Sequence, residues 1–379
     1  MIIQSQKHLF DIPEQVAYLN NAYMSPLMHS VVAAMETGIS RKVQPWHYTS
    51  DEFFTYAEEA RDLAGQIYGG PADNIAIVPS ASYGLQTAAN IVPLSQGQKV
   101  LVLEGQFPSN IYTWQDRAQK VGAELVILPT PQDDDWTRVL LTAIDSSTAI
   151  VAIPQTHWAS GVTINLILIR KALDASGGAL VLDLTQSLGA QPFNASEIRP
   201  DFAVVATYKW MMGPYSMGFL YVDPKWHDAE PLEHNWMNRA GSEDFTGLTN
   251  YQEAFQFGAR RFDMGEKSNP AQLLGASAAM RQILEWDVNN IAQTLQSKTD
   301  YIVNMLSGNQ ITPLPCELRA PHYLGLRFLE GVPKGLSESL AKDNIFVSVR
   351  GPAMRVTPHL YSTERDIERF IMALTQFNL

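Results

Sequence analysis

The sequence predicts an α/β protein whose large domain holds a seven-stranded, mostly parallel sheet, together with a smaller α+β domain. Seven short apolar runs lie between residues 75 and 222, and helix-length segments separate most of them. The runs are apolar almost throughout, which is typical of strands that helices bury on both faces. The predicted strands are residues 75–79, 99–103, 124–128, 149–153, 179–184, 202–206 and 217–222.

The segments on either side of this region predict further elements. Residues 1–15 predict an arm or a short helix, and helical periodicity covers 27–39 and 51–68, where Gly69-Gly70-Pro71 ends the second helix. Beyond residue 257 the alternation of helix-like and strand-like segments predicts a separate α+β domain. Its predicted elements are long helices at about 271–307, a strand in YLGLRF, a helix near 334–343, strands in IFVSVR and AMRVTP, and a last helix from Thr363.

Composition narrows the classes of function. The net charge of −12 argues against broad binding to nucleic acids or to anionic membranes. The single cysteine, Cys316, excludes an internal disulfide framework and a cysteine-rich metal site, and it fits a reducing compartment. The N-terminus has no apolar signal region, and no apolar run reaches the ~18 residues of a membrane span. We therefore expect a cytoplasmic protein. The acidic run Asp133-Asp134-Asp135 predicts a solvated turn, and no metal site is expected.

Two charged residues near the ends of neighbouring strands carry the strongest functional signal. Asp183 ends a buried strand, Gln186 follows three positions later, and Lys209 lies just past the next strand. A buried carboxylate favours the protonated ring nitrogen of pyridoxal phosphate, and a partly desolvated lysine can form a Schiff base with its aldehyde. Either residue alone is better explained as a helix N-cap or a surface lysine. The combination favours the cofactor.

Further candidates follow the other predicted strands, where ligands of parallel sheets bind. The stretch VPSASYGLQ joins a strand to a helix, whose free N–H groups and positive dipole end suit a phosphate, although an ordinary N-cap is the alternative. Phe107 can stack on a flat ring or be a core residue. His157 can hydrogen-bond a ring hydroxyl or be structural. The candidate phosphate ligands are Ser80, Ala81, Ser82, Thr207 and Tyr208, and packing is the alternative role for Tyr208.

Arginines near the C-terminus are the candidates for binding a substrate carboxylate. Arg355 is the first choice, because a guanidinium can clamp a carboxylate through two parallel hydrogen bonds. Arg350 is the second choice, with a structural ion pair as its alternative. Asn20, in the strand-like stretch VAYLNNAYMSPL, completes the predicted substrate-binding group.

These strings resemble the class V aminotransferase family, which contains cysteine desulfurases, kynureninase and isopenicillin N epimerase. The resemblance runs from YLNNAYMSP to LYSTERDIERFI and is strongest at LVLDLTQSLGA, at TYKWMMGP and around Arg355. It implies the fold type I of pyridoxal phosphate-dependent transferases and a homodimer with its sites near the subunit interface. It also implies a small domain built from both ends of the chain. We place the large domain at 16–257 and the small domain at 1–15 and 258–379.

The resemblance also implies roles for individual residues. Asp183 pairs with the pyridine nitrogen, and Gln186 pairs with the ring hydroxyl. Lys209 forms the Schiff base and later moves a proton at the substrate Cα. Arg355 clamps the α-carboxylate. Ala81 and Ser82 match the phosphate loop, Phe107 matches the stacking aromatic residue, and Ser268 matches a hydroxyl that reaches the partner subunit's cofactor phosphate, although its spacing departs from the family's Gly-Thr pair.

The resulting hypothesis is a pyridoxal phosphate enzyme that acts on an amino acid. An aminotransferase is the leading hypothesis, and a lyase or an epimerase is the alternative. Desulfurases carry a nucleophilic cysteine on the loop before the carboxylate-binding arginine. Here VSVRGPAMRVTP is short and has no cysteine, and Cys316 lies well upstream. This departure argues against a persulfide-forming desulfurase.

Two other classes of protein fit this sequence less well. A nicotinamide dehydrogenase needs a glycine-rich turn after its first strand, which VPSASYGLQ lacks. A non-catalytic cofactor-binding protein is disfavoured by the presence of Asp183, Lys209 and Arg355 together. The substrate side chain stays open, and residues 224–257, with His234, Trp236 and Arg239, are a candidate for shaping its pocket.

Overall fold

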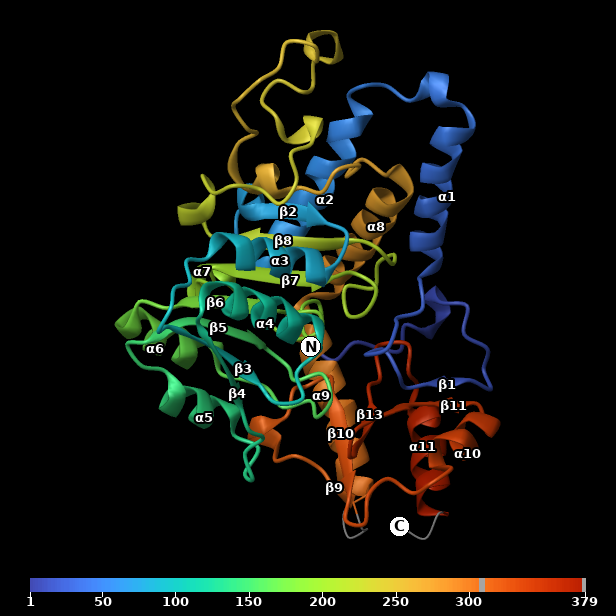
Figure 1. The fold of residues 1–379 in the computed structure, drawn as a ribbon. Coiled ribbons are helices and arrows are strands. Elements are labelled where there is room, and N and C mark those ends of the chain that lie inside the picture. Colours follow the sequence, from blue (N-terminus) through green and yellow to red (C-terminus); the bar gives the residue numbers. More distant parts are fainter. Residues whose placement is uncertain (307–310, 377–379) are drawn as a thin grey trace.

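The computed structural model describes residues 1–306 and 311–376, and its larger sheet contains all seven predicted strands (Figure 1). The strand order is β2-β8-β7-β6-β5-β3-β4, and β8 runs in the direction opposite to that of the other six strands. The prediction of a seven-stranded, mostly parallel sheet is therefore confirmed. The strands are β2 (Ile75–Val78), β3 (Lys99–Leu103), β4 (Glu124–Leu128), β5 (Thr148–Pro154), β6 (Ala179–Asp183), β7 (Phe202–Ala206) and β8 (Gly218–Val222).

Both faces of this sheet are buried, which explains the continuous apolar runs. Successive side chains of a strand point to opposite faces, so Leu180 and Leu182 of β6 enter one core while Ala179 and Val181 enter the other. The first core is closed by α2 (Glu52–Tyr68), α5 (Trp136–Ala143), α6 (Leu166–Ser176) and α8 (Pro270–Trp286). The second is closed by α3 (Ala81–Ile91) and α4 (Ser109–Val121).

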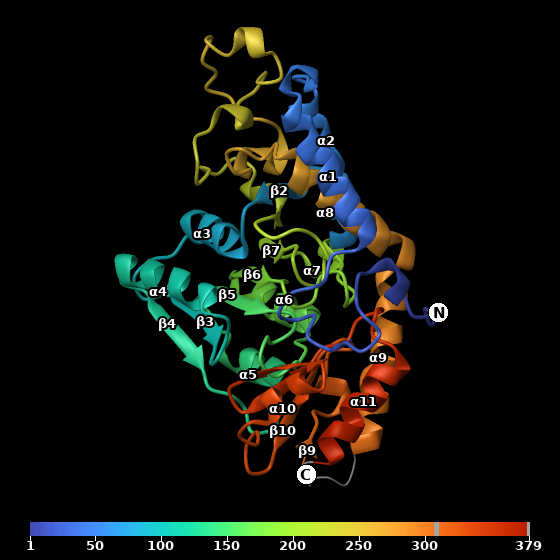
Figure 2. The same cartoon turned by 90° about the vertical axis from the view of Figure 1, so that its right-hand side faces the viewer.

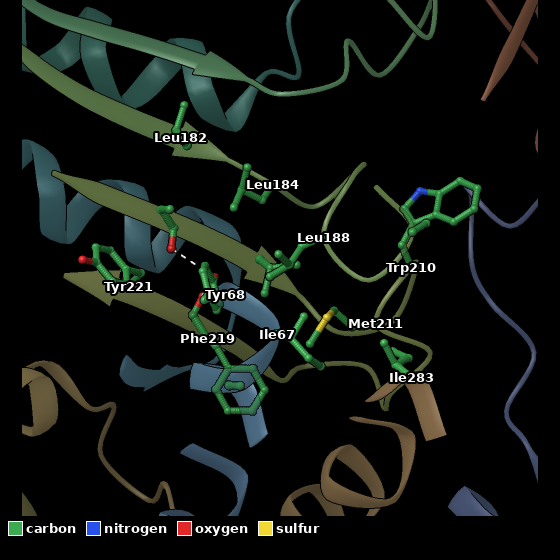
Figure 3. Close-up of a cluster of buried hydrophobic side chains, with 14 of the residues drawn as sticks. Ile67, Tyr68, Leu182, Leu184, Leu188, Trp210, Met211, Phe219, Tyr221 and Ile283 are labelled. Atoms are coloured by element: carbon green, nitrogen blue, oxygen red, sulfur yellow. Dashed lines mark hydrogen bonds between the residues drawn. The ribbon is translucent and has the colours of Figure 1, made fainter. Parts of the chain in front are cut away.

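The first core also anchors the segment that follows β7. Figure 3 shows Met211 near Ile67 of α2 and Ile283 of α8, and both Met211 and Trp210 are fully buried. Deeper in the same cluster, the Tyr68 hydroxyl donates hydrogen bonds to the carbonyl oxygens of Phe219, at 2.9 Å, and Ala203, at 3.1 Å. Because Trp210 and Met211 directly follow Lys209, the packing of this core fixes the lysine's backbone.

A second, four-stranded antiparallel sheet lies beyond the first, at the orange and red end of the chain (Figures 1 and 2). Its order is β12 (Ser348–Arg350), β13 (Ala353–Val356), β10 (Leu324–Phe328) and β9 (Ile311–Thr312). Its core is closed by α9 (Val288–Leu306), α10 (Leu336–Lys342) and α11 (Glu364–Thr375), whose N-cap is Thr363. Near the N-terminus, β1 (Ala17–Tyr18) pairs in parallel with β11 (Ile345–Phe346).

The two regions touch at one close backbone contact that matters for the site. A Cβ atom added to Gly325 of β10 would lie 2.3 Å from the carbonyl oxygen of Ser160, which belongs to the segment after β5. Only glycine allows so near an approach. The four-stranded sheet is therefore pressed directly against the carboxyl end of β5.

Most other elements lie close to their predicted positions. The predicted helix 27–39 is α1 (His29–Val43), and residues 1–15 contain only the 3-10 turn Lys7–Leu9. The predicted helical stretch 271–307 is two helices, α8 and α9, separated at Asp287, whose φ is +65°; residue 307 lies outside the described residues. The short α7 (Ala195–Ile198) precedes β7.

The domain boundaries stay a prediction. The first core includes buried residues of α8, such as Leu273 and Ile283, alongside strands of the larger sheet. Residues 224–257, drawn in yellow tones, form a projection at the top of Figures 1 and 2 with only short 3-10 turns. Within residues 1–306 and 311–376, no helix has the length and apolar character needed to cross a membrane.

Candidate active site

A cavity of about 310 Å³ lies where the parallel strands of the larger sheet end. Its walls come from the segments after β2, β3, β5, β6 and β7 and from the segment before the antiparallel β8. These segments meet because the carboxyl ends of parallel strands share one edge. Eight predicted site residues line the cavity: Ser80, Ala81, Ser82, Phe107, Asp183, Gln186, Tyr208 and Lys209.

Lys209 is buried in the cavity wall with 7% of its surface exposed. Its Nζ lies 5.5 Å from the centroid of the Phe107 ring and 5.3 Å from that of Tyr208. Burial lowers the pKa of Lys209 to about 8, and the charges of Arg355 and Arg350 act in the same direction, while Asp183 opposes them. The amine is thus partly neutral near physiological pH, as a nucleophile requires.

Asp183, the last residue of β6, is a buried carboxylate without a cationic partner within 4 Å among the described residues. Its Oδ1 accepts a hydrogen bond from the Thr185 N–H at 3.0 Å. Burial raises the pKa of Asp183, although Thr185 and the charge of Lys209 favour the ionised form. The carboxylate is therefore poised to be stabilised by a cation that enters the cavity.

The helix α3 begins at the opposite wall. Ser80 is its N-cap, and its Oγ accepts a hydrogen bond from the Tyr83 N–H at 3.2 Å and lies 2.9 Å from the Ser82 Oγ. The first N–H groups of a helix have no partner inside it, and its dipole places positive charge at this end. These features suit an anionic group, as predicted for the phosphate.

Polar side chains complete the walls. Gln186 Nε2 donates to the Ala22 carbonyl at 3.1 Å, and its Oε1 accepts from Trp210 Nε1 at 2.9 Å. One amide N–H thus remains for the predicted ring hydroxyl. Gln106 Oε1 and Asn110 Nδ2 also belong to residues that line the cavity, and both atoms are buried without a hydrogen-bond partner among the described residues.

The residues present fit pyridoxal phosphate. A buried carboxylate and a buried amine face a cavity that also opens on a helix N-terminus, and those features match the ring nitrogen, the aldehyde and the phosphate of the cofactor. Phe107 supplies an aromatic face beside the amine.

Arg355 on β13 is 2% exposed and has no acidic partner within 4 Å among the described residues. Its Nη1 donates to the Trp158 carbonyl at 3.2 Å, and its Nε donates to Ser348 Oγ at 2.9 Å. Ser348 in turn donates to Asn20 Oδ1 at 2.9 Å. Asn20 does not line the cavity and contacts Arg355 through Ser348, and its predicted role in substrate binding stays a prediction.

Neither Arg355 nor Arg350 lines this cavity, and His157, Thr207 and Ser268 also lie outside its lining. His157 stacks on Trp136 with ring centroids 5.9 Å apart, its Nδ1 lies 3.1 Å from Ser160 Oγ, and burial lowers its pKa to about 4. The Thr207 hydroxyl donates to the Pro214 carbonyl at 2.6 Å and to the Met217 carbonyl at 3.0 Å, so it stays within its own loop. Ser268 donates to the carbonyl of Phe53 in the first turn of α2. Their roles at the cofactor stay predictions, and that of Ser268 concerns the cofactor of a partner subunit.

Sequence reasoning missed Trp158, which lines the cavity where His157 was expected. Its indole N–H donates to the Gly105 carbonyl at 2.7 Å, and its ring meets Phe107 edge to face at 5.4 Å. An aromatic residue next to the predicted His157 was the only signal available. Thr185, the hydrogen-bond partner of Asp183, was also missed, although it stands two positions after it.

The projection 224–257 contributes nothing to this cavity. Its residues His234, Trp236 and Arg239 line a separate hollow of about 320 Å³. The hypothesis that they shape the substrate pocket is therefore not supported within one chain. Cys316 is exposed and does not line the cavity.

The lowered pKa of Lys209 predicts how cofactor attachment depends on pH. Only the neutral amine attacks an aldehyde, so attachment of pyridoxal phosphate to the cofactor-free protein should quicken about tenfold per pH unit below pH 8 and level off above it. Stopped-flow absorbance between pH 6 and 10 measures this rate. A rate that keeps rising to pH 10 would indicate an amine with the ordinary lysine pKa and contradict the role of burial.

Comparisons with known proteins find relatives and solved structures that match nearly the whole chain. The family model described as aminotransferase class-V matches residues 17–370. An uncharacterized aminotransferase, YcbU, of Bacillus subtilis is 23% identical over 384 residues, which span 95% of this chain and 96% of that protein. A cysteine desulfurase structure from Thermococcus onnurineus has a TM-score of 0.85 at 18% identity and covers 100% of this chain and 99% of its own. A mutant of C-DES with glycine covalently linked to its PLP cofactor has a TM-score of 0.87 at 17% identity, covering 97% and 98%.

Proposed function

The chain belongs to the class-V aminotransferase family, and on that premise we propose that it moves an amino group from an amino acid to a keto acid. Pyridoxal phosphate is the cofactor of this family. One observation carries the proposal: Asp183, Lys209 and Arg355 are buried charged groups with no ion-pair partner among the described residues. Burying such groups without partners is unfavourable, so their ligand must supply what they lack.

Each wall of the cavity has a part in holding the cofactor. The first turn of α3, with Ser80 and Ser82, would bind the phosphate, and Lys209 would hold the aldehyde carbon. Asp183 would keep the proton on the ring nitrogen, because no cationic side chain of the described residues lies within 4 Å of its carboxylate. Pyridoxal phosphate, when bound, supplies an electron sink that stabilises negative charge at the substrate Cα.

The substrate is bound and deprotonated by residues of both sheets. Arg355 would bind the α-carboxylate, and its guanidinium is already held in place by Ser348 and by the carbonyl of Trp158. Lys209, once freed from the aldehyde carbon, would take the proton from the substrate Cα and deliver it to that aldehyde carbon. Its pKa of about 8 suits both directions of proton transfer near neutral pH.

A lyase is the second candidate, because cysteine desulfurases are among the similar proteins. The hairpin between β12 and β13 speaks against the persulfide-forming type. Only Gly351 and Pro352 separate Arg350 from Ala353, so no loop is present there to carry a cysteine towards the cavity.

The discriminating experiment follows the amino group. The loaded protein is incubated with an ¹⁵N-labelled amino acid, with and without a keto acid, and the labelled products are identified by mass spectrometry. We expect label in a new amino acid only when the keto acid is present. Steady release of labelled ammonia without any keto acid would instead establish a lyase. Cys316→Ser is the matched control and should behave like the parent in both arms.

We also propose a homodimer, supported by apolar side chains exposed on one chain. Ile39 and Val43 of α1 are 57% and 69% exposed, and Trp46 and Phe257 are 73% and 72% exposed. Ile39 and Val43 are one helical turn apart on the same face of α1, and Trp46 follows the helix closely, so apolar surface gathers there as it does at interfaces. Sedimentation equilibrium should give twice the chain mass of 42.1 kDa, and Trp46→Glu should raise the fraction of monomer. A parent protein that sediments as a monomer would contradict the proposal.

A further inference from the structure

A second cavity, of about 290 Å³, adjoins the first, and Trp158 lines both. It lies between the segments that follow β3 and β5 and the hairpin of β12 and β13. Much of its lining is apolar or backbone, from Gly105, Trp136, Trp158, Ala159, Gly351, Pro352 and Ala353. We call this second cavity the chamber. When the reacting end of a substrate lies near Lys209, the chamber is separated from it by Trp158.

Two charged residues of this chamber, Arg327 and Glu104, already have partners. Arg327 forms a two-pronged ion pair with Asp134, with N···O distances of 2.7 and 2.5 Å. The Glu104 carboxylate accepts the Thr130 N–H at 2.9 Å. His157 is neutral at physiological pH because burial lowers its pKa to about 4.

Arg350, unlike Arg327, has no carboxylate partner within 4 Å among the described residues. Its Nη1 donates to the carbonyl of Val349 at 2.8 Å. Burial lowers the pKa of Arg350, and the like charge of Arg355 lowers it further. Two neighbouring guanidinium groups therefore share one region without an anion. A single α-carboxylate would compensate only one of them.

We propose that the second cavity is a subsite for an anionic side chain, so that the substrates are amino acids and keto acids that carry a second carboxylate. Arg355 would bind the α-carboxylate, and Arg350 would bind the carboxylate of the side chain. The apolar wall would contact the methylene groups between them. This inference rests on the proposed function, because it names the substrate class of the same site.

The test uses two unreactive acids of equal chain length, glutarate with two carboxylates and valerate with one. Their binding to the pyridoxal phosphate-loaded protein is measured by isothermal titration calorimetry. We expect glutarate to bind the parent at least ~10-fold more tightly than valerate, the usual size of one charged hydrogen-bonded contact. Arg350→Met should remove this preference and leave valerate binding within about twofold of the parent. Arg355→Met should weaken both acids.

Two further variants serve as controls. Arg138→Met removes an exposed guanidinium that pairs with Asp133, and should leave both affinities unchanged. Arg350→Lys keeps the charge and should keep most of the preference for glutarate, which separates loss of charge from loss of folding. Equal affinities of the parent for the two acids, equal weakening of both by Arg350→Met, or no binding of either acid would overturn the subsite. The proposed function is contradicted by a different result: the ¹⁵N experiment would show no amino transfer to any keto acid, whichever of the two acids binds.

Discussion

Replacing Lys209 with alanine is expected to lower the turnover of amino acid substrates by at least ~10³-fold, because one side chain supplies both the covalent attachment and the proton transfer. No other lysine lines the cavity among the described residues. Turnover is measured with a labelled amino acid and a keto acid. In the parent, borohydride should fix the yellow chromophore onto Lys209, and in Lys209→Ala it should fix none there.

The matched control is Lys120→Ala, which removes an exposed lysine that pairs with Asp116 on α4. It should retain the activity of the parent. A small amine added to Lys209→Ala should restore part of the turnover, since an external base can stand in for the missing one. If Lys209→Ala keeps more than about a tenth of the parent's turnover, the central assignment of the site is wrong.

Asp183→Asn is expected to give the second largest loss, a fall of about 10²–10³-fold in turnover at saturating cofactor. Removing one partner of a buried charge pair costs about 3–5 kcal/mol, and about 1.4 kcal/mol corresponds to a factor of ten in rate. The isosteric amide leaves the shape of the cavity unchanged but cannot hold the proton on the ring nitrogen. Turnover and the absorbance of the bound cofactor are the measurements.

Thermal unfolding of the cofactor-free protein separates this role from a structural one. Burial raises the pKa of Asp183, so the folded state disfavours its charge. When the pKa of a group is higher in the folded than in the unfolded state, the protein loses stability as the pH rises past the pKa of the unfolded state. At pH 7 the neutral asparagine should therefore leave Tm unchanged or raise it. A large drop in Tm would show that Asp183 is part of the fold's own charge balance.

The sequence was informative where burial constrains the residues strongly. The strands of the larger sheet are buried on both faces, which left continuous apolar runs that few other structures produce. Asp183 and Lys209 follow such runs directly, so their positions at the sheet edge were predictable. Their separation along the chain, with one strand between them, is what brings them to the same cavity.

The finer placement depends on contacts that no local pattern encodes. His157 and Trp158 are neighbours, and which of them faces the cavity is decided by packing of His157 on Trp136. Asn20 accepts a hydrogen bond from Ser348 of β12 because the segment after β1 pairs with the residue after β13, a contact across 328 positions. The projection 224–257 has no periodicity, so its position away from the cavity could not be read from the sequence.

The N-terminal segment around Asn21 and Ala22 reaches the cavity wall from far along the chain. The Ala22 N–H donates to Thr357 Oγ1, 335 positions away, and the Ala22 carbonyl accepts from Gln186. The Asn21 side chain donates to the carbonyl of Lys209 at 3.5 Å. During synthesis on the ribosome, the partner Thr357 emerges long after the sheet strands. The contacts that hold Gln186 and the backbone of Lys209 through this N-terminal segment are therefore completed only after the C-terminal part of the chain has been made.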